Sequence, residues 1–362
     1  MNRDPAERLS PDRAWPVAIL GATGAVGQTF VRLLARHPWF RVAEVAASER
    51  SVGRRYGDAV RWLEGELPEE IARLQVLTCD PAEVRSPLVF SALDSSVAGS
   101  VEESFARAGA LVFSNAKNHR MDPDVPLLIA EVNPSHRHLI AEQRRRRGWS
   151  GGIVTNPNCA ATVAAMALAP LHERFGVRAV TAFTMQAVSG AGYPGVPSLD
   201  ILANVIPYIA DEEEKVEREL RKLLGDLRDH SVVPADFAVS AHCNRVPTEH
   251  GHMVCMSVRL DSECQPADVI TALCEWHGAE ESRRLPSAPR PPIVYRAEPD
   301  RPQTRRDVWA GGGMSVTVGR VRSDPSGGIK LVALGHNTYR GAAGCSILNA
   351  ELLVADQSPA GA

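Results

Sequence analysis

Residues 15–38 read WPVAILGATGAVGQTFVRLLARHP, and this stretch decides the fold. An apolar strand predicted over residues 17–20 leads into a glycine-rich turn and then into an amphipathic helix. Glycines let a backbone turn sharply and approach a pyrophosphate closely, and the N–H groups at a helix start attract its charge. The spacing is G-x-x-G-x-x-G, so a purely structural turn is the alternative. We expect a dinucleotide-binding turn formed by Gly21, Thr23, Gly24, Ala25, Val26 and Gly27.

Alternating strands and helices continue after this turn. Apolar segments at 87–94 and 110–117 flank a helical stretch at 97–108. The alternation implies a parallel sheet with helices on both faces, as in a Rossmann-type α/β domain. Ligands of such sheets lie at the carboxyl ends of the strands, where Ser91 and Ala92 stand.

The end of the second predicted strand bears on the choice of cofactor. Folds that prefer NAD commonly place an acidic residue there, on the ribose 2′-hydroxyl. This chain instead has Ser48, Arg50 and Ser51 in that segment, although Glu49 lies among them. Hydroxyl and guanidinium groups suit a 2′-phosphate, so we expect NADP(H) in preference to NAD. The alternative is a solvated loop with incidental arginines.

Composition excludes several classes of function. The formal net charge of −3, spread over the chain, gives no electrostatic footprint for nucleic acid or an anionic membrane. The seven cysteines include no C-x-x-C pair, which argues against a disulfide framework or a zinc ribbon and favours a reducing, cytoplasmic location. No apolar stretch approaches the length of a membrane span. Residues 1–14 are polar, and we expect a flexible tail there.

The second half of the sequence has a different texture. Segments with alternating apolar and polar residues predict a β-rich, α+β domain. One clear helix lies among them, with Asp211 and Glu214 predicted as a capping box and Gly225 as a C-terminal cap. We therefore expect an NADP-binding domain over 15–157 and a catalytic and oligomerisation domain over 158–341. A last helix, over 342–362, should pack back on the first domain.

A cysteine stands where one predicted helix begins. Cys159 follows an Asn-Pro-Asn turn and precedes a run of alanines. Unpaired N–H groups and the helix dipole favour negative charge at that place, so the thiol should tend toward the thiolate and act as a nucleophile. The alternative, from this segment alone, is a small buried apolar residue.

Motifs along nearly the whole chain give these features a context. In order they are GATGAVG (21–27), ASERSVGRRYGD (47–58), SNAKN (114–118), DVPLLIAEVNP (124–134), TNPNC (155–159), MQAVSGAGYPGVPSLDI (185–201), EEEK (212–215), CNRVP with GH (243–252) and HNTYRGAAG (336–344). The chain thereby resembles the aspartate-β-semialdehyde dehydrogenase family, especially its archaeal and fungal-type branch. The resemblance implies reversible reduction of L-4-aspartyl phosphate by NADPH to the semialdehyde and phosphate, in the synthesis of lysine, methionine and threonine or in a dedicated secondary pathway.

The resemblance also implies catalytic roles. Cys159 would attack the acyl carbon and form a thioester that the nicotinamide can reduce. Gln186 would orient the reacting groups, and His252 would be the acid and base. Asn337 would approach the nicotinamide carboxamide, although an Asn in its place can simply shape a turn.

Four further positions match substrate-binding residues of the family. Arg245 would grip the α-carboxylate of the substrate, and Arg120 and Lys215 would hold the phosphate. Glu212 would meet the ammonium group. Because three glutamates stand in a row, the sequence leaves open which of them matches the family position. The alternative is a solvated first helical turn.

One departure from the branch concerns an H-x-H pair. His250 precedes His252, so the sequence leaves open which histidine faces the thiol. No third ligand is spaced to complete a zinc site, and we expect no metal.

Other functions remain open at this point. A related reductase of malonyl-CoA or of N-acetyl-glutamyl phosphate would keep the thioester step. A non-catalytic NADP-binding sensor would keep only the fold. The resemblance implies a homodimer or homotetramer, and the apolar segment 199–210 is the candidate interface, with core packing as the alternative.

Overall fold

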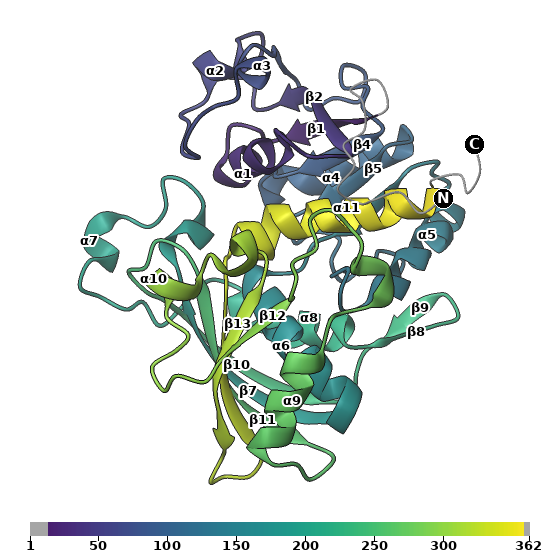
Figure 1. Ribbon diagram of the computed structural model, residues 1–362. Coiled ribbons are helices and arrows are strands. Elements are labelled where there is room, and N and C mark those ends of the chain that lie inside the picture. The colour runs from purple at the N-terminus through teal and green to yellow at the C-terminus, as the bar shows by residue number, and fades with distance from the viewer. Residues whose placement is uncertain (1–13, 358–362) are drawn as a thin grey trace.

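Two six-stranded sheets organise the computed structural model, which describes residues 14–357 (Figure 1). The flexible tail expected over 1–14 therefore lies almost wholly outside the described residues. The first sheet has the order β3-β2-β1-β4-β5-β6, and all its strands are parallel. This is the order of dinucleotide-binding folds, and the predicted Rossmann-type sheet is confirmed.

The elements of the first sheet follow the predicted alternation. The strands are β1 Trp15–Leu20, β2 Phe40–Ala46, β3 Val76–Leu77, β4 Leu88–Ser91, β5 Leu111–Ser114 and β6 Gly152–Thr155. The helices are α1 Ala25–Leu34, α2 Tyr56–Ala59, α3 Glu69–Ala72, α4 Ser95–Arg107, the 3₁₀ turn η1 Pro134–His138 and α5 Leu139–Arg147. Because β1 and β4 are neighbours while the chain runs outward from them in both directions, a crevice opens between their carboxyl ends.

The second sheet is mixed, with the order β10-β7-β11-β14-β13-β12. Its strands are β7 Val177–Gln186, β10 Ala238–Arg245, β11 His252–Leu260, β12 Ile293–Arg296, β13 Val316–Ser323 and β14 Ile329–Gly335. A small hairpin pairs β8 Asp226–Arg228 with β9 Ser231–Val233. The helical segments are α6 Cys159–Phe175, η2 Val188–Ala191, α7 Ser198–Ile201, α8 Glu212–Leu223, α9 Pro266–Glu275, η3 Glu280–Ser282, α10 Thr304–Asp307 and η4 Ala310–Gly313. The expected α+β texture of this half is confirmed.

Helix α6 is the centre of the second core. Every residue from Ala160 to Leu171 is buried, and α6 contacts α8, α9 and β11. Small alanine side chains let these neighbours approach closely, so the helix that begins at Cys159 is enclosed by packing. That enclosure fixes the position of its first residue.

The chain ends beside the first sheet. A π-helical turn, η5 Tyr339–Ala343, runs directly into α11 Gly344–Gln357. Ile347 and Leu348 of α11 belong to the same buried cluster as Val17 and Phe90 of β1 and β4. Figure 1 shows α11 lying along the first sheet. Residues 358–362 of the predicted last helix lie outside the described residues.

Asp211 is the N-cap residue of α8 as predicted, but the predicted capping box and the cap at Gly225 do not form. Asp211 has a positive φ of 58° and makes no side-chain cap; its carboxylate instead pairs with Lys117 Nζ at 2.6 Å. At the other end the cap residue is Leu224, and Gly225 packs so closely that a Cβ would lie 2.4 Å from Val233 O. In both cases a tertiary contact replaces the local motif. Among the described residues, no helix has the length and apolar character needed to cross a membrane.

Candidate active site

The turn between β6 and α6 places Cys159 at the first helical position. The Asn158 side chain is the N-cap: its Oδ1 accepts hydrogen bonds from the N–H groups of Ala160 and Ala161 at 2.9 and 3.0 Å. Gly341 of η5 packs directly against Cys159. A Cβ added to Gly341 would lie only 2.6 Å from the Cys159 Cβ. Cys159 as a residue keeps partial exposure, although its thiol is enclosed.

His252 is the histidine that faces the thiol. Its Nε2 lies 3.0 Å from Cys159 Sγ, and its Nδ1 accepts a hydrogen bond from the Ala187 N–H at 3.2 Å. A backbone hydrogen bond at Gly251 favours the protonated ring. The Ala187 contact belongs to the tautomer with its proton on Nε2; the tautomer that can take the thiol proton carries its proton on Nδ1 and gives up this contact.

Burial decides the resting protonation state of this pair. Burial, with help from Glu212, raises the pKa of Cys159 to about 12, although Arg120 and Arg245 act in the opposite direction. Burial and the nearby Arg245 lower the pKa of His252 to about 3. Both directions favour a thiol beside a neutral imidazole at neutral pH. Burial opposes the predicted tendency toward a thiolate, because desolvation acts on the pKa of this sulfur against the helix N-terminus.

Helix α8 brings two of the predicted substrate-binding residues to the turn. Glu212 is buried and accepts a hydrogen bond from Asn158 Nδ2 at 2.7 Å. Glu213 bonds instead to the Cys243 N–H, and Glu214 is exposed, so Glu212 is the glutamate that faces the site. The solvated-turn alternative does not hold for it. Lys215 Nζ lies 3.4 Å from Glu212 Oε2 and keeps an exposed side.

Strand ends of the second sheet supply two more polar groups. Arg245 and Gln186 are register partners at the ends of β10 and β7, and both are buried. Arg245 Nη1 donates to Ala187 O at 2.9 Å, and Gln186 Nε2 donates to Thr184 Oγ1 at 3.3 Å. The shared register sets these two residues side by side, and His252 is the first residue of β11, which pairs with the other edge of β7.

Arg120 reaches the site from the first sheet, but most of its guanidinium is already engaged. Nη1 donates to Glu219 at 2.9 Å and Nη2 donates to Asn115 O at 2.7 Å. Its Nε is buried and has no hydrogen-bond partner within the part of the chain that the structure describes. An uncompensated buried donor on a cation is suited to an anion.

The glycine turn after β1 has the form of a phosphate cradle. Gly21 has a φ of 71°, and a Cβ there would lie 2.6 Å from Ala92 O across the β1–β4 crevice. A Cβ on Gly27 would lie 2.2 Å from Gly21 O. Gly24 is the N-cap of α1 without a side-chain cap, and the first turn holds no acidic residue. The Gly24 N–H already donates to Gly21 O at 3.0 Å, so the N–H groups of Ala25 and Val26, at the start of α1, are the ones suited to the phosphates of a dinucleotide.

The other predicted cofactor contacts divide into two groups. Ser48 and Arg50 are exposed beyond β2, whereas Ser51 is buried and its N–H donates to Ser48 O at 2.8 Å. At the end of β4 the Ser91 hydroxyl donates to Glu102 Oε1 at 2.6 Å and is fully buried. The Ser91 hydroxyl thus bonds to a residue of α4. The residue at this strand end that lies next to the glycine turn is Ala92.

A cleft of about 300 Å³ connects the cofactor turn with the second sheet. Its lining includes Ala25 and Thr29 of α1, the loop over residues 188–195, and the rings of His250, Trp309 and Tyr339. His250 Nδ1 lies 3.2 Å from Ser189 Oγ and therefore belongs to this cleft. Within residues 14–357, no cluster of three or more His, Cys, Asp or Glu side chains is arranged to hold a metal.

Asn337 lies between His336 and Thr338, which line the cleft. Its Oδ1 accepts from the Gly251 N–H at 2.9 Å, and its Nδ2 donates to Ser189 Oγ at 2.8 Å. Both ends of the amide thus have protein partners, as the turn-shaping alternative requires. Sequence reasoning missed Asn158 and Glu219, which hold the turn and Arg120; the N-cap position of Asn158 before Cys159 was the available signal.

Comparisons with known proteins extend over almost the whole chain. Residues 16–140 match the family described as semialdehyde dehydrogenase, NAD binding domain, and residues 168–340 match the semialdehyde dehydrogenase, dimerisation domain. An aspartate-semialdehyde dehydrogenase of Archaeoglobus fulgidus is 50% identical over 344 residues, which are 95% of this chain and 99% of that protein.

Two further relatives bear on cofactor and substrate. The crystal structure of aspartate semialdehyde dehydrogenase with NADP from Candida albicans has a TM-score of 0.87 and 41% identity, covering 95% of this chain and 99% of that one. A malonyl CoA reductase (NADP) of Metallosphaera sedula is 41% identical over 348 residues, which are 94% of this chain and 97% of that protein.

Proposed function

Because the chain belongs to the semialdehyde dehydrogenase family, we propose that it is an aspartate-semialdehyde dehydrogenase. It reduces L-4-aspartyl phosphate with NADPH to L-aspartate 4-semialdehyde and inorganic phosphate, reversibly, through a thioester on Cys159. The Cys159–His252 contact at 3.0 Å supports this chemistry, because a sensor without catalysis needs no nucleophile paired with a proton acceptor.

The chemistry begins with the thiol proton. As Sγ attacks the acyl carbon, Nε2 of His252 takes this proton in the tautomer whose ring proton is on Nδ1. The carbon–oxygen bond to phosphate breaks and phosphate leaves with the bonding electrons. N–H groups at the start of α6, including that of Cys159, are suited to the oxyanion of this step. Gln186 would orient the reacting groups through its amide without titrating.

NADPH supplies the hydride that reduces the thioester carbon. The carbon–sulfur bond then breaks, the aldehyde leaves, and the proton on His252 Nε2 returns to the sulfur. The Gly21–Gly27 turn fits the pyrophosphate of the cofactor, and the exposed Ser48 and Arg50 fit its 2′-phosphate. Ala92 and, through its amide, Asn337 would border the nicotinamide half.

Glu212 is the observation that carries the choice of substrate. It is a buried carboxylate, 2.7 Å from the Asn158 amide that precedes the nucleophile. Aspartyl phosphate brings an ammonium group for Glu212, a carboxylate for Arg245 and a phosphate for Arg120 and Lys215. Malonyl-CoA has no ammonium group, so it would leave the proposed contact of Glu212 unmade, although its carboxylate could still pair with Arg245.

The second domain is also the proposed oligomerisation surface. Its family is the dimerisation domain, and the segment 199–208 exposes Leu199 at 90%, Tyr208 at 66% and Leu202 at 64%. Such exposure excludes core packing for these three side chains and suits a homodimer or homotetramer. We assign residues 15–157 and the last helix to the cofactor domain and 158–341 to the catalytic domain. All seven cysteines are free, in keeping with a cytoplasmic enzyme.

One steady-state comparison tests the proposed function. Purified protein is supplied with aspartate semialdehyde plus phosphate, with malonyl-CoA, or with N-acetyl-glutamate semialdehyde plus phosphate, each with the NADP and the NAD form of the cofactor. We expect phosphate-dependent reduction of NADP with aspartate semialdehyde. Turnover of malonyl-CoA without turnover of aspartate semialdehyde would overturn the assignment.

A further inference from the structure

Helix α8 carries two buried charged residues that the proposed chemistry does not use. Glu212, Lys215, Glu219 and Lys222 recur at helical spacing and share one face of α8. The first two have proposed substrate roles. Glu219 and Lys222 are only 2% and 4% exposed, and both bond to segments outside α8.

The Glu219 carboxylate joins two parts of the site. One oxygen, Oε1, accepts from Arg120 Nη1 at 2.9 Å, and the other, Oε2, accepts from the Asn158 N–H at 2.6 Å. Arg120 comes from the loop after β5, and Asn158 is the residue before the nucleophile. A single buried side chain therefore links the anion-binding arginine to the nucleophile turn by two charge-assisted hydrogen bonds.

Lys222 holds the backbone of the same loop. Its Nζ donates to the carbonyl oxygens of Arg120, Asp122 and Val125 at 2.7, 2.8 and 2.9 Å. Three acceptors match the three donors of an ammonium group, so the loop is fixed to α8 at three points.

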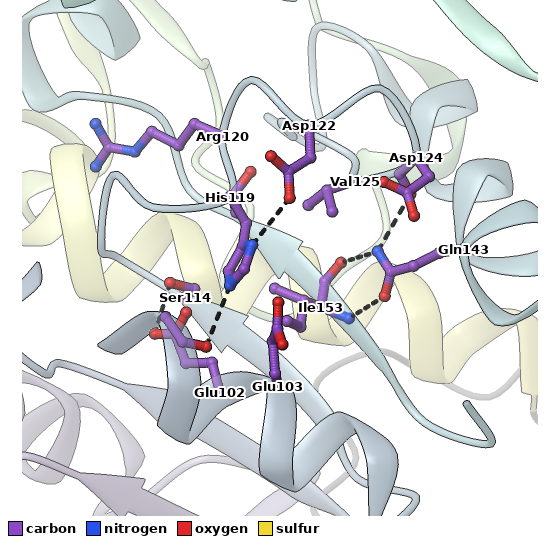
Figure 2. Close-up of polar contacts among 12 residues, drawn as sticks. Glu102, Glu103, Ser114, His119, Arg120, Asp122, Asp124, Val125, Gln143 and Ile153 are labelled. Atoms are coloured by element: carbon purple, nitrogen blue, oxygen red, sulfur yellow. Dashed lines mark hydrogen bonds and ion pairs between the residues drawn. The ribbon is translucent and has the colours of Figure 1, made fainter. Parts of the chain in front are cut away.

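On its other side, this loop is tied to helix α5 of its own domain. His119 and Asp122 point toward each other, 2.9 Å apart, and Arg147 of α5 bonds to Asp122 at 2.8 Å. Figure 2 shows Arg120 projecting away from this group. With the backbone fixed on both sides, Glu219 determines where the end of the Arg120 side chain lies.

We propose that Glu219 is a positioning residue: it orients the Arg120 guanidinium for binding the phosphate and holds it at a fixed place relative to the Asn158–Cys159 turn. Lys222 fixes the backbone of the loop that carries Arg120. This inference rests on the proposed function. After Glu219 and the Asn115 carbonyl have oriented the guanidinium, the unpartnered Nε of Arg120 and the second N–H of each Nη nitrogen are the donors left for the anion. Arg120 thus approaches the phosphate in one orientation, at a fixed place relative to the sulfur.

Glu219→Gln tests this role with almost no change in volume. A glutamine offers one acceptor and one donor group, so it cannot accept from both Arg120 and Asn158. We expect the KM for phosphate in aldehyde oxidation to rise about tenfold or more, which is the loss of one charge-assisted hydrogen bond. The KM for aspartate semialdehyde should change by less than about threefold, because Arg245 and Glu212 are untouched.

A matched control lies on the same helix. Glu217 accepts a hydrogen bond from the Ala241 N–H at 3.0 Å and bonds to neither Arg120 nor Asn158. Glu217→Gln should leave the KM for phosphate unchanged. The double variant Glu219→Gln with Arg120→Lys should show no further rise over Arg120→Lys alone, if Glu219 acts through Arg120.

The outcomes separate this inference from the proposed function. Wild-type protein that does not oxidise aspartate semialdehyde with phosphate would refute the function itself. Wild-type activity together with an unchanged KM for phosphate in Glu219→Gln, or with equal effects of Glu219→Gln in both Arg120 backgrounds, would overturn the positioning role. If Glu219→Gln does not fold, Glu219→Asp decides by the same comparison, since its shorter arm cannot span both partners.

Discussion

The Nε2 atom of His252 lies 3.0 Å from Cys159 Sγ, whereas His250, two residues earlier, bonds to Ser189 in the neighbouring cleft. The sequence left the choice between these histidines open, and the geometry separates them. Only His252 can exchange a proton with the sulfur directly. His250 packs its ring against His336, with centroids 4.9 Å apart, and forms part of the cleft wall.

Replacing each histidine in turn tests this separation. His252→Asn should lower kcat by about 10²–10⁴, the usual contribution of a general acid or base. His250→Asn should change kcat by less than about fivefold, because its ring does not reach the sulfur. Steady-state kinetics of both variants, with NADPH binding as the check on folding, make the comparison. Equal losses in the two variants would show that the proton path is shared.

Glu212→Gln tests the recognition of the substrate ammonium. Removing the carboxylate should lower kcat/KM for aspartate semialdehyde by about 10–100-fold, as expected for a lost charge-assisted bond. Succinate semialdehyde lacks the amino group, so its kcat/KM should not fall in the variant. Glu214→Gln, on the exposed side of α8, is the matched control. A similar loss with both aldehydes would remove Glu212 from ammonium binding.

The protonation state of Cys159 can be read from its alkylation. Since the pKa of the buried thiol is raised to about 12, the thiolate fraction grows throughout the neutral and mildly alkaline range. The rate of iodoacetamide reaction at Cys159, followed by peptide mass spectrometry, should rise about tenfold per unit between about pH 6 and 9. A plateau in that range would mean that the resting sulfur is already ionised.

The cofactor preference depends on an exposed arginine. Arg50→Ala should raise the KM for NADPH by about tenfold, because a guanidinium–phosphate contact is lost. NADH has no 2′-phosphate, so its KM should stay within about twofold of the wild-type value. Initial rates with the two cofactors give the answer. A parallel rise for NADH would place Arg50 elsewhere on the dinucleotide.

Local sequence patterns predicted the features that depend on neighbouring residues. The glycine turn after β1 was readable because its residues are adjacent and their spacing reflects backbone geometry. The same holds for Cys159 at the start of α6, where Asn158 caps the helix. The parallel sheet followed from the alternation of apolar strands and helices.

Features that depend on distant contacts were not readable. Glu212 could not be chosen among three glutamates until α8 was packed against Asn158. The Glu219–Arg120 pair joins residues 99 positions apart in the sequence. Asp211 likewise pairs with the distant Lys117 and does not form the predicted side-chain cap. The raised pKa of Cys159 comes from burial, which only the tertiary structure determines.

The covalent intermediate is the central claim, and intact-protein and peptide mass spectrometry test it directly. Enzyme mixed with aspartate semialdehyde and NADP⁺ in the absence of phosphate should form NADPH in a single burst and retain one aspartyl group on Cys159, released by added phosphate. Cys159→Ser should bind NADPH normally and show neither burst nor adduct. A burst without an adduct on Cys159, or an adduct on another residue, would contradict the account.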